Sequence, residues 1–203
     1  MAHIDYYLSL VSPYVYLAGR RPWEIAARHG ATLAVHPVDL GALLPRTGGI
    51  ALADRHESRK AYRLQELRRH AARVGLPLRL QPAFFPVNGA PAAYAVIAAD
   101  RAGDGDLAGL IHALGRALWA EDRDIADDEV IRTCLAGAGF DPALADRGML
   151  AGAETYIANL EAAVGRGVFG VPFFIADGDE RFWGQDRLDD LDAFLAGMSI
   201  LVR

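Results

Sequence analysis

The sequence predicts an α/β protein in which a small layer of four strands and two helices is interrupted by a large all-helical insertion. The first forty residues alternate as strand, helix and strand, and the last forty read as strand, strand and helix. Between them, helical patterns dominate for more than a hundred residues. Without this block the pattern is that of a thioredoxin-like fold. We therefore expect a thioredoxin-like domain formed by 1–42 and 165–203, and a helical insertion domain formed by 43–164.

The N-terminal part predicts a parallel strand–helix–strand unit. Ile4–Val11 is a mostly apolar run typical of a buried strand, and Thr32–Val38 is a second one. Tyr14–His29 carries apolar residues at helical spacing. Ser12 is then expected at the N-cap of this helix and Pro13 at its first position, where the missing N–H costs nothing. Two parallel strands joined by one helix form a right-handed crossover.

The middle of the chain predicts helices separated by loops. The stretch that contains Gly41, Pro45, Gly48 and Gly49 is expected to be a loop, and the proline-rich Leu78–Pro91 an extended connection. Asp–Pro and Asp capping patterns support several of the helix starts. The helices expected here are Asp54–Val74, Ala92–Arg101, Asp106–Glu121, Asp127–Ala138, Pro142–Arg147 and Ala151–Val164.

The end of the chain returns to strands. Val171–Ala176 is strand-like, the turn signal Asp-Gly-Asp follows at 177–179, and Arg181–Trp183 is expected to pair with the first of these strands. Asp186–Leu195 is expected to form the closing helix. This completes the four strands and two helices of the predicted layer.

Composition limits the classes of function. The chain has 203 residues, 52% of them hydrophobic and 23% charged, which is typical of a globular protein. Its net charge of −5 argues against a nucleic-acid partner. One group of basic residues on the predicted Asp54–Val74 helix is interpreted as a solvated face: Arg59, Lys60, Arg63, Arg68, Arg69 and Arg73. Neither a leader pattern nor an apolar stretch of membrane-spanning length is present, so we expect a cytoplasmic protein with no membrane association.

Cysteine and histidine usage argues against redox and metal chemistry by the chain's own residues. The only cysteine, Cys134, excludes an internal disulfide and a CxxC pair. The six histidines form no pair at ligand spacing with a carboxylate or thiol, so no metal site is expected.

The junction between the first strand and the first helix is the first candidate site. Free N–H groups and the helix dipole at such a junction favour a thiolate, and thioredoxin-like folds place a reactive cysteine there. This chain presents the hydroxyl of Ser12 instead. If the site works on sulfur, that sulfur must arrive with a cofactor. The alternative is an ordinary N-cap serine.

A second candidate is the Val171-Pro172 step after a glycine-rich turn. A proline here cannot donate to a sheet, so it belongs at an edge or in a cis turn. A cis bond would leave the Val171 backbone free to pair with an extended, peptide-like ligand, provided that Pro172 faces Ser12. The alternative is a simple strand start.

A third candidate precedes the closing helix. Backbone N–H groups at a helix start suit a carboxylate, and the side chain of Asp186 suits an ammonium group. A ligand with both an α-amino and an α-carboxyl group would satisfy the two. The alternative is a helix cap with Trp183 in the core.

Together these segments resemble the 2-hydroxychromene-2-carboxylate isomerases and, more distantly, the kappa-class glutathione transferases and the DsbA-type oxidoreductases. The resemblance covers essentially the full chain, and its terminal motifs are specific in combination. The residues that carry it most clearly are Tyr7–Ala18, Gly167–Pro172 and Phe182–Leu188.

The resemblance implies a glutathione-dependent cis/trans isomerase of aromatic-degradation intermediates. Ser12 matches the family's catalytic serine, which holds the glutathione sulfur as a thiolate. Val171 and a cis-Pro172 match the position that pairs with the cysteinyl backbone of glutathione. The segment that receives the γ-glutamyl end is matched by Trp183, Gly184, Gln185 and Asp186.

The resemblance also implies a small aromatic substrate. Its candidate contacts are Lys60, Asn88 and Arg187, of which Lys60 and Arg187 are the groups that would neutralise a substrate carboxylate. Lys60 is alternatively a glutathione contact or a solvated helix lysine. The naphthalene-pathway isomerases have an arginine-bearing loop where Ala83–Gly89 of this chain contains no basic residue. Family members often form dimers, which leaves a homodimer open.

Two other functions remain open from the sequence. One is a kappa-type glutathione transferase, which would bind the same cofactor and release a thioether. The other is a non-catalytic thioredoxin-like module that binds peptides or a partner at the Pro172 edge.

Overall fold

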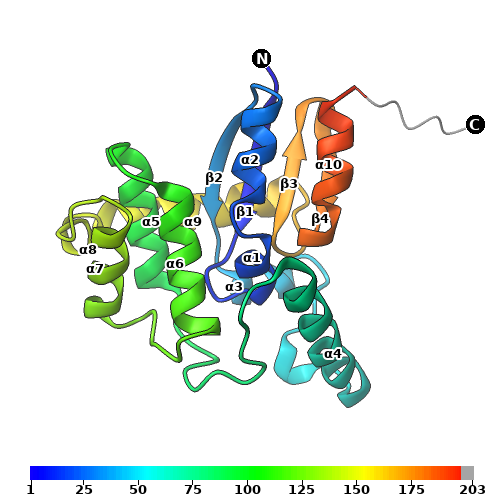
Figure 1. Ribbon diagram of the computed structural model, residues 1–203, viewed down its shortest axis with the longest axis horizontal. Coiled ribbons are helices and arrows are strands. Elements are labelled where there is room, and N and C mark those ends of the chain that lie inside the picture. The colour runs from blue at the N-terminus through cyan, green and yellow to red at the C-terminus, as the bar shows by residue number, and fades with distance from the viewer. Residues whose placement is uncertain (198–203) are drawn as a thin grey trace, which may run out of the picture.

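The computed structural model describes residues 1–197 and contains one mixed four-stranded sheet. β1 lies parallel to β2 and antiparallel to β3, and β4 is antiparallel to β3, which gives the order β2-β1-β3-β4. Helices α2 and α10 lie in front of the sheet and α9 behind it (Figure 1). This arrangement confirms the predicted thioredoxin-like fold. The strands are β1 (His3–Leu8), β2 (Thr32–Pro37), β3 (Phe173–Ala176) and β4 (Glu180–Trp183).

Helices α3 to α9 fill the chain between β2 and β3, as the predicted insertion requires. Short 3₁₀ turns η1 (Leu52–Asp54), η2 (Asp177–Asp179) and η3 (Gln185–Arg187) complete the architecture. The helices are α1 (Pro13–Ala18), α2 (Arg21–Arg28), α3 (Leu40–Arg46), α4 (Glu57–Val74), α5 (Ala90–Ala102), α6 (Leu107–Trp119), α7 (Asp128–Gly137), α8 (Leu144–Arg147), α9 (Met149–Gly165) and α10 (Leu188–Leu195).

The single helix expected over Tyr14–His29 is wrong, because α1 and α2 are separate. Gly19 ends α1 with a φ of 58°, a conformation that glycine adopts at little cost. Pro22 lies in the first turn of α2. A continuous helix would require an N–H from Pro22 to the carbonyl of Ala18, and proline has none.

The loop expected around Gly41 and Pro45 is also wrong, because these residues belong to α3. The side chain of Asp39 caps this helix by accepting a hydrogen bond of 3.1 Å from the N–H of Ala42. After the helix, the N–H of Gly49 donates to the carbonyl of Leu44 at 2.8 Å. Local capping therefore outweighs the poor helix propensity of glycine and proline here.

The closing helix starts later than expected. Asp186 lies in the 3₁₀ turn η3, and α10 begins only at Leu188. The first strand likewise stops at Leu8 instead of Val11, since the chain turns there and the N–H of Ser12 donates to the carbonyl of Ser9 at 2.9 Å.

The sheet and the helices share one continuous hydrophobic core. Tyr6 at the centre of the sheet and Trp119 at the end of α6 both belong to it, and both are fully buried. The division into 1–42 with 165–203 and 43–164 stays a prediction, and its residues 198–203 lie outside the described part of the chain.

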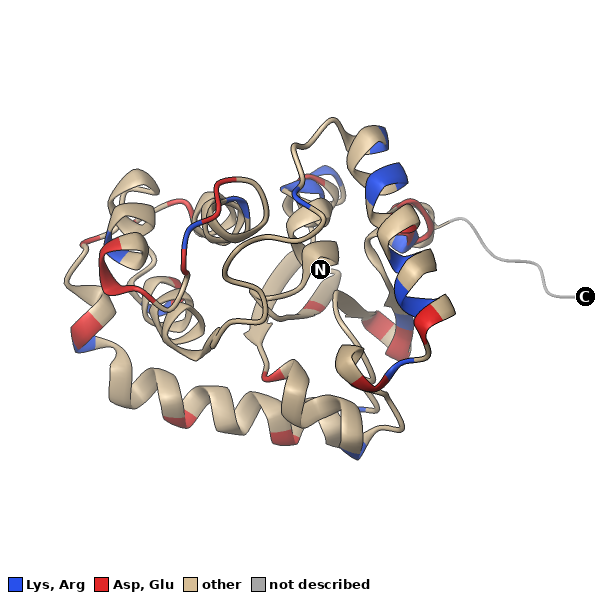
Figure 2. Ribbon diagram, turned by 90° about the horizontal axis from the view of Figure 1, so that it is seen from below, with Lys and Arg blue, Asp and Glu red and all other residues tan. Residues whose placement is uncertain are grey.

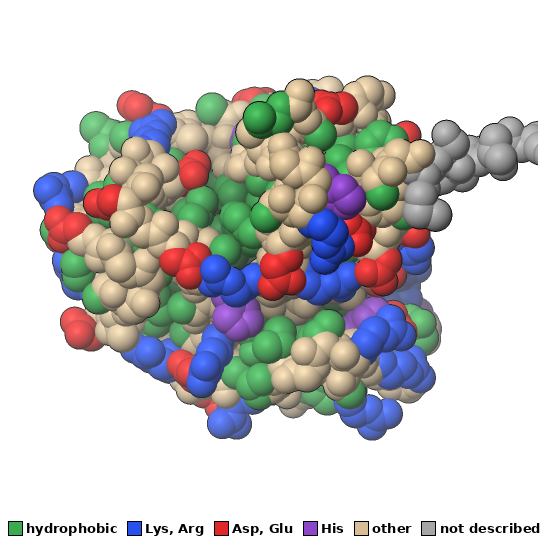
Figure 3. All heavy atoms as spheres, turned by 45° about the horizontal axis from the view of Figure 1, so that its top comes forward, with side chains coloured by type: hydrophobic (Ala, Val, Ile, Leu, Met, Phe, Trp, Pro, Cys, Tyr) green, Lys and Arg blue, Asp and Glu red, His purple; other side chains and the backbone are tan. Residues whose placement is uncertain are grey.

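Two faces of the molecule differ in their charge. Acidic and basic side chains alternate across the face that contains α2 and α10 (Figure 3), where Arg21 pairs with Asp189 at 2.6 Å. On the opposite side, α9 runs along the molecule with few charged residues (Figure 2). None of the helices within residues 1–197 combines the length and apolar character needed to span a bilayer.

A half-buried carboxylate connects the sheet to the end of α9. Asp5 on β1 lies 2.8 Å from Nε2 of His36 on β2 and 3.3 Å from Nε2 of His3, and it also pairs with Arg166 beyond α9. Burial alone would raise the pKa of Asp5, but the hydrogen bonds from His36, Arg166 and His3 outweigh it and lower the pKa. The native carboxyl therefore remains ionised where that of the unfolded chain takes up a proton.

We expect Asp5→Asn to lower the free energy of unfolding at neutral pH by roughly 1–3 kcal/mol, because charge-assisted bonds are lost. The Asp5 contribution is complete above about pH 4 and is lost as the pH falls through the lowered native pKa. Urea titrations of both proteins at several pH values measure the difference. Asp179→Asn, which removes an exposed pair with Arg181, is the control. A difference independent of pH down to acid conditions would contradict this account.

Candidate active site

The register of the sheet brings the two ends of the fold together. Tyr7 of β1 lies opposite Phe173 of β3 in an antiparallel pair. The residues that follow β1 therefore lie next to those that precede β3, which places Ser12 and Pro172 at the same end of the sheet. The Val171-Pro172 bond is cis, as the sequence analysis anticipated. Within residues 1–197, the backbone N–H and C=O of Val171 have no hydrogen-bond partner.

Ser12 is the N-cap of α1 and Pro13 is its first residue, as predicted. The Ser12 side chain makes no capping hydrogen bond, although the residue is only 3% exposed. The N–H groups of Tyr14 and Val15 belong to the first turn, where no carbonyl within the helix can accept them. The hydroxyl and these N–H groups therefore form a polar spot at the start of α1.

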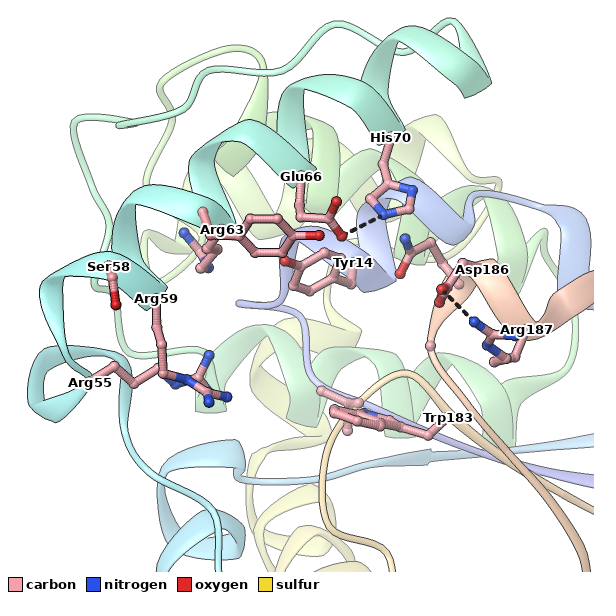
Figure 4. A pocket seen from close by; sticks show the side chains of 14 residues that line it. Tyr14, Arg55, Ser58, Arg59, Arg63, Glu66, His70, Trp183, Asp186 and Arg187 are labelled. Atoms are coloured by element: carbon pink, nitrogen blue, oxygen red, sulfur yellow. Dashed lines mark hydrogen bonds and ion pairs between the residues drawn. The ribbon is translucent and has the colours of Figure 1, made fainter.

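A pocket of about 600 Å³ opens beside this spot. Its walls come from α4 on one side and from the β4–η3 segment on the other, with Tyr14 of α1 between them (Figure 4). The volume lies within the range of about 300–1,000 Å³ that small-molecule sites occupy. Ser12 and Pro172 do not line the pocket directly, whereas Val171 does.

The β4–η3 wall consists of the segment that the sequence analysis singled out. Trp183, Gly184, Gln185 and Asp186 all line the pocket. The indole of Trp183 is 54% exposed and faces the opening, so the alternative that placed it in the core is wrong. The N–H of Gly184 donates to the carbonyl of Pro172 at 2.9 Å, which ties this wall to the cis bond.

Charged groups at the end of this wall form a small network. Arg187 pairs with Asp186 at 3.3 Å and with Asp190 at 3.2 Å, and both Asp186 and Arg187 line the pocket. An ammonium group near Asp186 and a carboxylate near Arg187 would both find a partner of opposite charge.

The α4 wall contains Arg59 and Arg63, which the sequence pattern predicted on a solvated face but which line the pocket. Arg55, just before the helix, lines it too (Figure 4). Arg68 and Arg73 of the same helix do not line it. The spacing of four residues was the available signal, because residues four apart lie on one helix face. Which face meets the pocket depends on tertiary packing.

Two predicted substrate contacts lie elsewhere. Lys60 does not line the pocket, and its ammonium pairs with Glu57 at 2.8 Å. Asn88 also stays outside, where its side chain accepts a hydrogen bond of 3.1 Å from the N–H of Ala90 at the start of α5. Both have structural partners in this arrangement, whereas Arg187, the third predicted contact, is a pocket residue.

The polar groups between the walls are suited to donate hydrogen bonds. Burial raises the pKa of Tyr14, so its hydroxyl stays protonated and can donate at neutral pH. His70 pairs with Glu66 at 3.5 Å, and both side chains face the pocket.

Cys134 lies outside this pocket, in α7, where burial raises the pKa of its thiol. No cluster of three metal-ligating side chains occurs in the described part of the chain.

We expect Gly184→Ala to disturb the β4–η3 wall. Gly184 has a φ of 114°, and a Cβ there would lie 2.4 Å from Oδ1 of Asp186. Strain and collision together should lower the free energy of unfolding by about 1–3 kcal/mol, measured by chemical denaturation. Gly178→Ala is the comparison, since Gly178 has a φ of 76° in the left-handed region and open space around it, so it should lose less stability. Equal losses in both variants would contradict the additional strain and contact expected at Gly184.

Comparisons with known proteins identify the family of the chain. Residues 3–196 match the family described as DSBA-like thioredoxin domain. A 2-hydroxychromene-2-carboxylate isomerase of Sphingobium xenophagum is 30% identical over 195 residues, which cover 95% of this chain and 97% of the relative. A solved 2-hydroxychromene-2-carboxylate isomerase superposes with a TM-score of 0.77 at 26% identity, over 97% of this chain and 95% of that one.

The same fold occurs in a protein of different activity. The cytosolic disulfide reductase DsbM of Pseudomonas aeruginosa, solved with GSH, has a TM-score of 0.68 at 22% identity, over 96% of this chain and 98% of that one. The family match and the full-length relatives together identify the group. The chain belongs to the DSBA-like thioredoxin family and, within it, to the 2-hydroxychromene-2-carboxylate isomerases, and it is an enzyme of the isomerase class.

Proposed function

We propose that this isomerase depends on glutathione and acts on a conjugated intermediate of aromatic degradation. The observation that carries the proposal is the pocket, in which the free backbone of Val171 and the Trp183–Asp186 segment lie beside the start of α1. Relatives named 2-hydroxychromene-2-carboxylate isomerase support the class of substrate. A neighbour of the same fold solved with GSH supports the cofactor.

The residues of the pocket fit a γ-glutamyl tripeptide. Val171 offers an unpaired N–H and C=O just before β3, at the end of the sheet, which suits the backbone of a central cysteine. Asp186 and Arg187 supply opposite charges for the amino and carboxyl groups of the γ-glutamyl end. Arg59 on the facing wall has no carboxylate partner among the described residues and suits the carboxylate at the other end.

Ser12 is the residue that we assign to the sulfur. Its hydroxyl is not used as a helix cap, so it can donate a hydrogen bond to a sulfur placed at the start of α1. A free thiol, with a pKa near ~8.5, is only a few per cent ionised at neutral pH, and a donor at this point favours the thiolate. α1 has only six residues, so the hydroxyl and the first-turn N–H groups matter more than the helix dipole.

When bound, glutathione supplies a nucleophilic sulfur whose reversible addition turns a conjugated double bond into a single bond that can rotate. The chain's own residues orient the partners. Tyr14, protonated at neutral pH, can donate to an oxygen of the substrate as negative charge develops there. Ser12 does not attack, and no net oxidation or reduction takes place at the chain.

We expect Ser12→Ala to lower kcat by about tenfold or more, because a hydrogen bond to a charged group is lost. The fold should remain intact, since the Ser12 side chain makes no capping bond. Turnover of 2-hydroxychromene-2-carboxylate, followed by absorbance in the presence of glutathione, measures the effect. Free glutathione should be recovered after turnover, which separates isomerisation from conjugation.

Ser9→Ala is the control for this substitution. Ser9 lies three residues earlier in the same turn and is 5% exposed, so the control removes a hydroxyl of matching burial. It should retain the activity of the wild type. Unchanged turnover in Ser12→Ala would refute the assignment of Ser12.

We also expect glutathione to stabilise the protein against heat. A ligand at a hundred times its Kd adds ~2.7 kcal/mol, which for a chain of this size raises Tm by about 5–10 °C. Differential scanning calorimetry with and without millimolar glutathione tests this. Cysteinylglycine, which lacks the γ-glutamyl end, should raise Tm less, and a Tm indifferent to glutathione would exclude the cofactor.

A further inference from the structure

Arg63 occupies an unusual position on the α4 wall of the pocket. Its guanidinium lies 5.9 Å from the ring centroid of Phe85 and 5.9 Å from that of Trp119. The centroids of these two rings lie 4.9 Å apart, and Trp119 is fully buried. The rings support the planar cation from the side of the core, while its other side belongs to the pocket. The guanidinium is therefore oriented by packing before any ligand binds.

No carboxylate of residues 1–197 forms an ion pair with this cation. The acidic residues of α4 are engaged elsewhere, since Glu57 pairs with Lys60 at 2.8 Å and Glu66 with Arg69 at 3.4 Å. Burial lowers the pKa of Arg63, and an arginine nevertheless keeps its charge at neutral pH. A half-buried cation without a partner carries a desolvation cost that a bound anion would offset.

Two neighbouring cations also favour the binding of an anion in this pocket. Arg59 precedes Arg63 by four residues on the same helix face, and like charges at this spacing destabilise a helix. Arg55 also lines the pocket, and its Nε is already committed to the carbonyl of Ile50 at 2.9 Å. Arg63 differs from both because aromatic rings hold it in place.

We propose that Arg63, supported by Phe85 and Trp119, forms a carboxylate subsite that binds the second substrate, an aromatic or conjugated carboxylic acid. This inference rests on the proposed function for the distinction between cofactor and substrate. Arg63 lies on α4, across the pocket from the Trp183–Asp186 wall that suits the tripeptide (Figure 4). The planar guanidinium binds a carboxylate through two parallel hydrogen bonds, which fixes the orientation of the acid. The rings of Tyr14 and Tyr62, which also line the pocket, offer faces for its conjugated part.

The subsite also gives the segment Ala83–Gly89 a role. This segment contains no basic residue, so it offers no charge of its own to a carboxylate. Phe85 nevertheless packs against the guanidinium that lines the pocket. The segment thus positions a cation that belongs to α4.

Binding of a simple acid and its neutral analogue tests the subsite without requiring turnover. Isothermal titration calorimetry with trans-cinnamate and trans-cinnamamide would be performed on the full chain, with and without saturating glutathione. The wild type should bind trans-cinnamate at least tenfold more tightly than the amide. Arg63→Gln should remove most of this preference, and Arg63→Lys should retain only part of it, because lysine keeps the charge but loses the planar fork.

Arg68→Gln is the matched control, since Arg68 is exposed on the same helix and does not line the pocket. It should bind both compounds as the wild type does. Melting curves of all variants verify folding, and Arg63→Lys keeps the test valid if Arg63→Gln is unstable.

Each outcome decides between alternatives. Equal affinity for acid and amide in the wild type would overturn the subsite, and so would unchanged cinnamate binding in Arg63→Gln. A loss of glutathione affinity in Arg63→Gln equal to the loss of cinnamate affinity would also overturn it, because Arg63 would then serve the tripeptide. Selective cinnamate binding through Arg63 in a protein that ignores glutathione would support the subsite and refute the cofactor.

Discussion

The antiparallel pairing of β1 with β3 is the constraint on which the rest of the site depends. These strands come from opposite ends of the chain, and Tyr7 faces Phe173 in their register. A shift by one residue would turn every side chain of β3 to the other face of the sheet, and it would move Val171 away from the turn after β1. Both strands are buried, so the hydrophobic core fixes the register. The geometry of the pocket therefore follows from the packing of the sheet.

Much of the fold could be predicted because its boundaries are marked by residues with strong local preferences. Ser12 and Pro13 mark the start of α1, and Asp127 caps α7 through the N–H groups of Glu129 and Val130. Prediction failed where two local signals competed. Asp39 capped a helix through glycine and proline that read as a loop, and Pro22 divided a helical pattern that read as continuous.

The candidate site could likewise be predicted only in part. Trp183–Asp186 is a contiguous motif, so the sequence alone predicts its residues, and the structure brings them to one pocket wall. The sequence could not predict which residues of α4 line the pocket. Lys60 and Arg63 lie on different faces of the helix, and only tertiary packing decides which face meets the pocket. Helix α4 buries only Leu67 and Ala71, and so few apolar residues give little sequence signal for its rotation.

This sparse burial has a consequence for how ligands enter. Helix α4 spans eighteen residues and fully buries only Leu67 and Ala71, whereas the opposite wall is joined to the sheet by the hydrogen bond from Gly184 to Pro172. Local opening is least costly where apolar contacts are fewest. Of the two walls, the one that carries the arginines is therefore the one whose displacement breaks no hydrogen bond to the sheet among the described residues, so a change in the width of the pocket costs least on the side of α4.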